Sequence, residues 1–343
     1  MPKGRLRARE GDLILTKDGL FFDVKGYVHP PGRVVAFLRY LPSGAGGRLL
    51  SGGRYVKVYD LRERWKILEE KYPGYIFYDG VFHARLQGVP EAEVKALYEP
   101  RRRLEEILAS GGRGIEAEAA EMAKTLAEES GCSTGDLGVT GSILAGLQLE
   151  SSDLDLVVYG FKQAVKVREA LSSLLEEGRE FEPCDDETLY RIYKARGMDE
   201  ALSFEAFREN EGGKALQGKF RGRDYFVRCV KDWGEVDEAY GDKIYYPEGR
   251  ARIEATVVDD GESILTPCRY RVSGVKTLLG RAAAVSEVSS FRGRFCEQAS
   301  AGDRIEAEGK LERVVDRRRG EESYRLLLGE NPRDFMIVKG KGR

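Results

Sequence analysis

The chain has 343 residues, and 33% of them are charged, yet the formal net charge is only −2. This length favours two or three domains over one. The near-neutral balance excludes a general electrostatic attraction to nucleic acid or to membranes, so such a partner would need a local patch. The many charges stand beside only two Asn and five Gln, a composition that suggests a protein from a hot environment.

The cysteines and histidines do not form a recognisable metal or disulfide pattern. The five cysteines are Cys132, Cys184, Cys229, Cys268 and Cys296. None belongs to a C-x-x-C motif, and His29 and His83 stand alone. Buried free thiols in a reducing compartment are therefore expected. The start of the chain lacks a signal-peptide pattern and no apolar run is long enough to span a membrane, so we expect a cytoplasmic protein without membrane partners.

Residues 1–98 predict a small β-rich α+β domain. Asp18-Gly19 between two apolar runs indicates a β-hairpin. Helical spacing over 61–73, "LRERWKILEEKYP", predicts a helix, and "YIFYD" a short strand. The segment "VPEAEVKALYEP", residues 89–100, predicts a second short helix with a proline near its start.

Residues 99–248 predict a mainly helical core with a few strands. The Ala- and Glu-rich run 115–130 is a strong helix signal and ends at Gly131, a typical C-terminal cap. Further helices are expected at 161–178 and over most of 186–218, and "RDYFVRCV" predicts a strand. From residue 249 to 343 the pattern changes to five short strand-like runs with turns between them, which suggests a small β-barrel or sandwich. We expect a β-barrel or OB-like domain here.

Two carboxylates near the centre of the chain carry the main chemical signal. In "GSILAGLQLESSDLDLVVYG", residues 141–160, Asp153 and Asp155 lie one residue apart. In a strand they point to the same face, while Leu154 and Leu156 point to a core. Adjacent carboxylates repel each other and are best tolerated around a cation. Oxygen ligands of this kind suit Mg²⁺ shared with substrate phosphates.

A Gly-Ser turn precedes the acidic pair. Gly141 lets a ligand approach the backbone, and Ser142 lies at an expected helix start, where free N–H groups favour phosphate. Either part alone could be a solvated turn or loop. The combined order of helix, Gly-Ser, ten residues, Asp-apolar-Asp-apolar and a buried strand is more specific, and it predicts a phosphate cradle followed by a metal site.

This order resembles the signature of the DNA polymerase β-like nucleotidyltransferase superfamily. The matching residues are Gly141, Ser142, Asp153, Leu154, Asp155 and Leu156. The motif resemblance covers about residues 115–232. More broadly, the chain is similar to a group of archaeal predicted nucleotidyltransferases of unassigned substrate, in "GLFFDVKGYVHPPGRVVAFLRYLP" and "SFRGRFCEQ". The resemblance implies a mixed sheet with helices and a two-metal mechanism with Mg²⁺ or Mn²⁺. A nucleoside monophosphate would pass from a nucleoside triphosphate to an acceptor.

Superfamily members usually add a third carboxylate on a neighbouring strand. Asp224, which follows Arg223 at the start of the predicted strand, is the first candidate for this catalytic role, and Glu254 is the second. Neither lies in a clean copy of the family pattern. The alternative is therefore a catalytically silent nucleotide- or RNA-binding protein with the same fold.

The sequence does not identify the acceptor, which could be an RNA end, a protein side chain or a small molecule. Basic runs at 101–103 and 317–319, together with Arg292 and Arg294, could contact phosphates. Flanking glutamates favour a solvated charged face instead for the two triplets. The isolated histidines exclude the usual triad, and no P-loop pattern is present.

Overall fold

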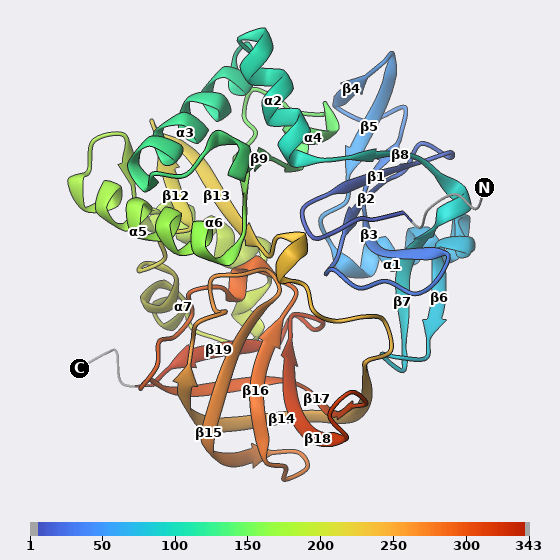
Figure 1. Ribbon diagram of the computed structural model, residues 1–343, viewed down its shortest axis with the longest axis vertical. Coiled ribbons are helices and arrows are strands. Elements are labelled where there is room, and N and C mark those ends of the chain that lie inside the picture. The colour runs from blue at the N-terminus through green and yellow to red at the C-terminus, as the bar shows by residue number, and fades with distance from the viewer. Residues whose placement is uncertain (1–5, 340–343) are drawn as a thin grey trace. The chain divides into compact units, whose positions relative to one another are not determined.

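The computed structural model describes residues 6–339, which form three β-sheets and seven α-helices (Figure 1). The predicted α+β class is therefore confirmed. The chain divides into two compact units. Unit 1 extends to Gln163 and includes Val230–Tyr240, and unit 2 combines Ala164–Cys229 with the chain from Gly241 onward. No helix within the described range is long and apolar enough to cross a membrane.

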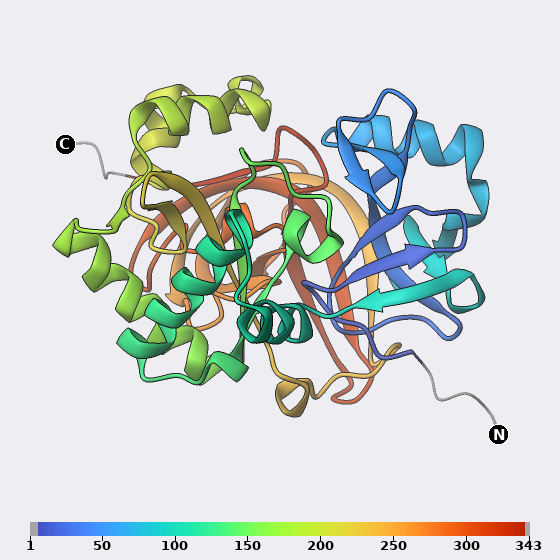
Figure 2. The same cartoon turned by 90° about the horizontal axis from the view of Figure 1, so that it is seen from above.

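An eight-stranded antiparallel sheet forms the N-terminal part of unit 1. Its strands are β1 (Leu13–Thr16), β2 (Phe21–Val24), β3 (Arg33–Pro42), β4 (Arg48–Leu50), β5 (Gly53–Lys57), β6 (Ile76–Asp79), β7 (Ala84–Pro90) and β8 (Val94–Tyr98). The order is β4-β5-β3-β2-β1-β8, with β7 paired to β3 and β6. The predicted Asp18-Gly19 hairpin joins β1 and β2, and Gly19 adopts a φ of 81°. Helix α1 (Leu61–Lys71) lies along this sheet (Figure 2).

The prediction of a helix at residues 89–100 is wrong. Only Glu91–Glu93 forms a single 3₁₀ turn, and Val94–Tyr98 is strand β8, paired with β1. Ala96 and Tyr98 pack on one face of the sheet and Leu97 on the other. This alternation is the period of a strand. The short apolar run is also compatible with a helical pattern. Pairing with the edge of β1 stabilises the strand instead of the helix.

The two faces of the N-terminal sheet pack against different helices. One face buries Ile14, Phe22 and Leu38 together with Leu68 of α1. The other buries Leu13, Leu15, Phe21 and Tyr40 together with residues of the short helix α4 (Gly141–Ala145). A register shift between Phe21 and Phe22 places Tyr40 opposite Phe21 and so on the α4 face. The N-terminal sheet and the predicted phosphate turn therefore share one core.

The remainder of unit 1 supports the acidic pair. Its elements are α2 (Pro100–Ser110), α3 (Ile115–Ser130), β9 (Leu137–Val139), α4 and β10 (Leu154–Tyr159). Strands β9 and β10 pair antiparallel, and α3 packs against both of them through its alanine-rich side. Gly131 ends α3 in the left-handed conformation, as predicted, and its N–H returns to the last carbonyls of the helix.

Unit 2 begins with helices and three antiparallel strands. Helix α5 (Phe161–Glu177) crosses the boundary from unit 1 and is followed by β11 (Phe181–Glu182), α6 (Asp186–Ala195), α7 (Phe204–Glu211), β12 (Gln217–Phe220) and β13 (Arg223–Val230). Strand β12 pairs with both β11 and β13. The helices expected between 186 and 218 are present as α6 and α7, although Gln217 already begins β12.

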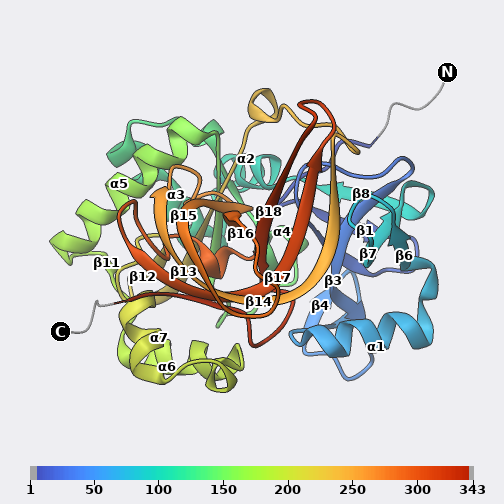
Figure 3. The same ribbon diagram turned by 90° about the horizontal axis from the view of Figure 1, so that it is seen from below.

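The C-terminal sheet of unit 2 is a closed barrel. Its strands are β14 (Lys243–Asp259), β15 (Cys268–Leu279), β16 (Val285–Ser290), β17 (Arg304–Asp316), β18 (Glu321–Leu328) and β19 (Phe335–Val338). The order β14-β15-β16-β18-β17-β19 closes because β14 also pairs with β17 (Figure 3). Only β16 and β18 pair in parallel among the described strands of this sheet.

Candidate functional site

The predicted acidic pair lies at the start of strand β10. Asp155 is the second residue of the strand and is half-buried, while Asp153 directly precedes the strand and is exposed. Leu154 and Leu156 are fully buried. Along β10 the half-buried Asp155 alternates with the buried Leu154 and Leu156, as expected from the sequence, whereas Asp153 lies just outside the strand.

Gly141 and Asp155 approach each other so closely that only glycine fits. A Cβ atom built on Gly141 would lie 2.1 Å from Oδ2 of Asp155, and the φ of Gly141 is 64°. The N–H of Thr140 also donates to the main-chain oxygen of Asp155 over 2.9 Å. The structure thus brings the Gly-Ser turn and the second aspartate together, as the sequence predicted.

The first turn of α4 has no side-chain cap from the described residues. Within residues 6–339 the carboxylate of Asp155 forms no hydrogen bond or ion pair, although the residue is half-buried. Ser142 is 4% exposed and lies in the first turn of α4. The Thr140 hydroxyl does not cap α4 but donates to the carbonyl of Gly11 over 2.7 Å. Hydrogen-bonding capacity at this turn therefore remains for a ligand.

Basic residues of the N-terminal sheet lie on the face that packs on α4. Lys57 of β5 lies directly opposite Tyr40 of β3 in the antiparallel ladder, and Arg48 of β4 lies opposite Tyr55. Directly opposite residues project from the same face of a sheet, and Tyr40 belongs to the face that packs on α4. Arg48 also donates through Nη1 to the carbonyl of Leu147, shortly after α4.

The charges of this face act on one another. Burial lowers the pKa of Lys57, nearby Arg39 lowers it further, and Asp155 opposes the shift. Burial raises the pKa of Tyr40 to about 12 despite Arg39 and Arg48, and Asp155 adds to the rise. Nζ of Lys57 lies 4.7 Å from the ring centre of Tyr59. We call Arg39, Tyr40, Arg48 and Lys57 the basic face.

Sequence reasoning missed the basic face. The segments "VVAFLRYLP" and "YVKVYD" predicted strands correctly, but no motif connects their basic residues with an acidic pair about a hundred positions away. The alternation of Tyr55 and Lys57 with Val56 and Val58 indicated one polar side of a strand. The identity of the element facing that side could not be read from the pattern.

The acidic pair fits a divalent metal that is shared with a substrate. No cluster of three or more His, Cys, Asp or Glu side chains with metal-binding geometry occurs in the described part of the chain. Mg²⁺ usually binds through one or two carboxylates and completes its shell with water and phosphate oxygens. The side chains of Asp153 and Asp155, next to a turn without Cβ at Gly141, satisfy this requirement.

Both candidates for a third carboxylate belong to unit 2, and both are ion-paired there. Asp224 on β13 binds Arg191 and lies 3.8 Å from Nζ of Lys219. Glu254 on β14 binds Lys339 and lies 3.8 Å from Arg304. These partners balance the two carboxylates, and the role of Asp224 as the third catalytic acid stays a prediction.

The basic runs differ in their surroundings. Arg101 stacks 4.1 Å from the ring centre of Tyr159 and pairs with Asp232, and Arg103 pairs with Glu116. These two arginines therefore stabilise unit 1. Residues 317–319 instead occupy the exposed turn between β17 and β18.

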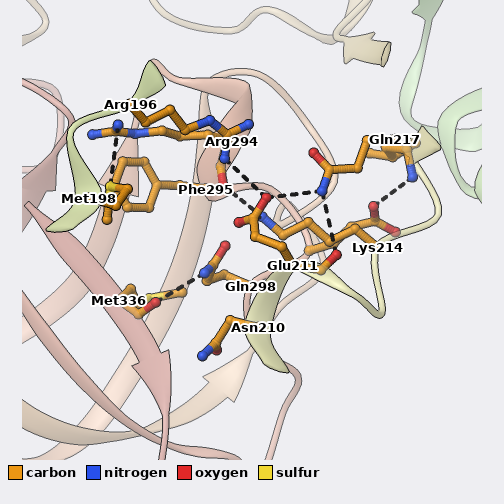
Figure 4. A network of polar contacts seen from close by, with 12 residues as sticks. Arg196, Met198, Asn210, Glu211, Lys214, Gln217, Arg294, Phe295, Gln298 and Met336 are labelled. Carbon is orange, nitrogen blue, oxygen red and sulfur yellow. Dashed lines mark hydrogen bonds and ion pairs between the residues drawn. The ribbon is translucent and has the colours of Figure 1, made fainter. Parts of the chain in front are cut away.

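Unit 2 contains a separate buried polar network around Glu211, the last residue of α7 (Figure 4). Lys214 donates to its carboxylate over 2.6 Å, and Arg196 and Gln217 donate over 3.0 Å each. Burial would raise the pKa of Glu211, but Lys214 and Arg196 lower it to about 2. The network joins α6, α7 and β12, so its first role is to hold these elements together.

Comparison with known proteins identifies one relative over nearly the full length. The chain is 32% identical over 340 residues to "Uncharacterized protein MJ1086" of Methanocaldococcus jannaschii, covering 96% of this chain and 98% of the relative. No family model matches the chain, and no solved structure matches it.

Proposed function

We propose that this protein catalyses metal-dependent nucleotidyl transfer. The chain belongs to one family with MJ1086, an archaeal protein described only as uncharacterized, so we infer the function from the geometry of the site. A nucleoside monophosphate would pass from a nucleoside triphosphate to an acceptor. One observation carries the proposal: Asp155 is half-buried and without an ion-pair partner in residues 6–339, against a glycine turn that leaves no space for a side chain.

The residues would divide the work as follows. Asp153 and Asp155 would hold Mg²⁺ or Mn²⁺, which when bound would neutralise charge on the reacting phosphate. Gly141 and Ser142 would offer N–H groups and a hydroxyl to phosphate oxygens. Phosphoryl-type transfer depends on positioning and charge neutralisation rather than on a protein nucleophile. The proposed site residues Gly141, Ser142, Asp153 and Asp155 include no histidine or cysteine.

A polymerase β-like core remains part of this proposal, as do Asp224 as the third acid and a cytoplasmic location. The closed barrel is proposed as an OB-like acceptor module. In chain order its fourth and fifth strands are β17 and β18, and the loop between them holds residues 317–320. The corresponding loop of OB-folds is one of those that contact oligonucleotides.

The test is incubation with each labelled nucleoside triphosphate and Mg²⁺ or Mn²⁺, with and without cellular RNA and protein. We expect label on one acceptor class, and Asp155→Asn should reduce the rate by at least ~10²-fold, as expected for losing a strong electrostatic stabiliser of the transition state. Asp136→Asn, in a turn outside the site, is the control. Equal rates for Asp155→Asn and wild type would remove the acidic pair from the mechanism.

The second candidate function is nucleotide or RNA binding without catalysis. It is favoured by the cationic partners of Asp224 and Glu254, which already balance both third-acid candidates. Under this alternative a labelled triphosphate would be retained by the protein and no label would reach any acceptor.

A further inference from the structure

We propose that the basic face of the N-terminal sheet binds the polyphosphate chain of the nucleotide, with Lys57 as its central contact. This inference rests on the proposed function, because it names how the same site holds its substrate. It assigns the N-terminal part of unit 1 to nucleotide binding rather than to recognition of the acceptor.

The first argument is unpaired charge. Arg39, Arg48 and Lys57 are all half-buried, yet none forms an ion pair with any residue between 6 and 339. Lys25, directly after β2, is buried, and its Nζ lies 3.1 Å from a carboxylate oxygen of Glu10. Since desolvated charges normally have partners, three cations without an ion pair, with only the carboxylate of Asp155 acting on Lys57, leave an excess of positive charge that indicates an added anion.

The second argument is position. Lys57 and Tyr40 are cross-strand neighbours on the face that packs on α4, and α4 begins at Gly141, which touches Asp155. Arg48 is fixed beside this helix by its hydrogen bond to the carbonyl of Leu147. These contacts place the cations on the face that packs on α4, where the charge of Asp155 acts on Lys57.

The third argument is a buried hydroxyl. Tyr40 is fully buried, and its hydroxyl group has no hydrogen-bond partner in the described structure. A buried polar group without a hydrogen-bond partner destabilises the folded protein. A ligand oxygen at the basic face would satisfy this donor and remove the destabilisation.

These features together favour a polyphosphate over other anions. Several cations across one face match a ligand with several negative oxygens, and arginine forks suit phosphate geometry. The neighbouring unpaired aspartate requires a cation, which a polyphosphate can carry with it as a shared metal. A carboxylate ligand would neutralise one charge and would leave the other cations and Asp155 unpaired.

Titration of the intact protein with inorganic tripolyphosphate in EDTA, followed by calorimetry at low salt, tests this site without any transfer reaction. Lys57→Gln should weaken binding at least tenfold, and Lys57→Arg should retain most of it. Lys66→Gln, on the exposed side of α1, is the matched control and should bind as wild type. Asp155→Asn should bind equally or more tightly, because it removes a repelling charge.

Absence of tripolyphosphate binding by wild type, or equal affinities of Lys57→Gln and Lys66→Gln, would overturn the inference. If Lys57→Gln does not fold, acylation of the lysines of the wild-type protein provides the test. Tripolyphosphate should protect Lys57 and not Lys66 from acylation. Equal labelling of Lys57 with and without tripolyphosphate would refute the inference. Binding that depends on Lys57, without transfer of label to any acceptor, would support the basic face and reject only the catalytic proposal.

Discussion

Tyr40 combines complete burial with a hydroxyl that has no hydrogen-bond partner in the described residues. Its ring packs 6.2 Å from the centre of the Phe21 ring, edge to face, and contributes to the core between the sheet and α4. The ring and the hydroxyl therefore have separable roles. The ring stabilises the fold, and the hydroxyl adds nothing to stability in the free protein.

Tyr40→Phe tests this separation, because phenylalanine retains the ring and removes only the hydroxyl. We expect unchanged or slightly higher stability, within about 1 kcal/mol, since an unsatisfied polar group is lost. Affinity for tripolyphosphate should fall roughly 3- to 10-fold, the size of one hydrogen bond. Urea denaturation and calorimetry measure the two effects. A variant that is clearly less stable would mean that the hydroxyl is already bonded in the free protein.

Asp12 is a second buried residue with an unusual property. It is 4% exposed, and burial raises its pKa to about 8, although the N–H of Arg9 donates to its carboxylate over 2.9 Å and the charge of Arg9 opposes the rise. In the unfolded chain the pKa of an aspartate is about 3.9. Between these two values the folded state holds a proton that the unfolded state has released.

The free energy of unfolding should therefore decrease as pH rises from about 4 to about 8, by up to about 1.4 kcal/mol per pH unit from this residue alone. Asp12→Asn has no such titration, so its stability should decrease less over the same range. Urea midpoints of both proteins at pH 5 and pH 8 provide the comparison. Parallel pH profiles would show that Asp12 is ionised in the folded protein.

The sequence was sufficient to predict the Gly-Ser turn and the aspartates of the site, but it could not predict the basic residue Lys57. Gly141, Ser142, Asp153 and Asp155 lie within fifteen positions, so local spacing and strand alternation were sufficient to place them together. The charge of Asp155 also acts on Lys57, but a strand pairing and a helix contact between distant parts of the chain bring Lys57 to this face. Such long-range packing has no local pattern.

At the level of elements, the same limit explains the error at β8. Residues 94–98 can be written as one helical turn or as a strand, and their own sequence does not decide. Pairing with β1 and burial on two faces stabilise the strand. The long helices α3 and α5 were predicted correctly because many turns repeat the same amphipathic pattern and glycines follow their ends.

The junction of α6, α7 and β12 depends on Glu211. This residue is 3% exposed and binds Lys214, which is 5% exposed, and Arg196. Because its pKa is lowered to about 2, the stabilisation from Glu211 is complete above about pH 4.5 and is lost as pH falls toward 2. At neutral pH the negative charge of Glu211 therefore balances the positive charges of Lys214 and Arg196.

Glu211→Gln should destabilise the protein by about 3–5 kcal/mol, because it leaves the buried Lys214 charge without its anion. Glu209→Gln, on the exposed side of the same helix, is the control and should change stability by less than about 0.5 kcal/mol. Urea denaturation at pH 7 measures both. If the two variants were equally stable, the charge of Lys214 would be solvated or carried by another group.

At the scale of the whole molecule, the C-terminal barrel packs with helices that precede it in the chain. The pattern changes at about residue 249, but the barrel forms one compact unit with residues 164–229. Phe335 of β19 packs with Leu189, Tyr193 and Phe207 of the preceding helices. Removing the barrel would therefore expose an apolar surface on α6 and α7, and point substitutions are a better test of its role.

Arg317 and Arg319 are the best positions for such a test. Both are exposed in the turn between β17 and β18, and neither forms an ion pair within the described range. The carboxylate of Asp316 accepts from the N–H groups of Arg318 and Arg319, over 2.9 and 3.0 Å, which shapes the turn without involving the Arg317 and Arg319 side chains. A phosphate backbone could therefore reach both side chains.

If the barrel recognises an RNA acceptor, the double substitution Arg317→Glu and Arg319→Glu should weaken binding of a labelled single-stranded RNA and reduce its dependence on salt. Each lost phosphate contact lowers the slope of log K against log salt concentration by about 0.7, so a reduction of about 1.4 is expected. Tripolyphosphate affinity should not change, since the basic face is a separate site. Arg62→Glu, exposed on α1, controls for net charge. RNA affinity and salt slope equal to those of wild type would assign these arginines to solvation of the barrel surface alone.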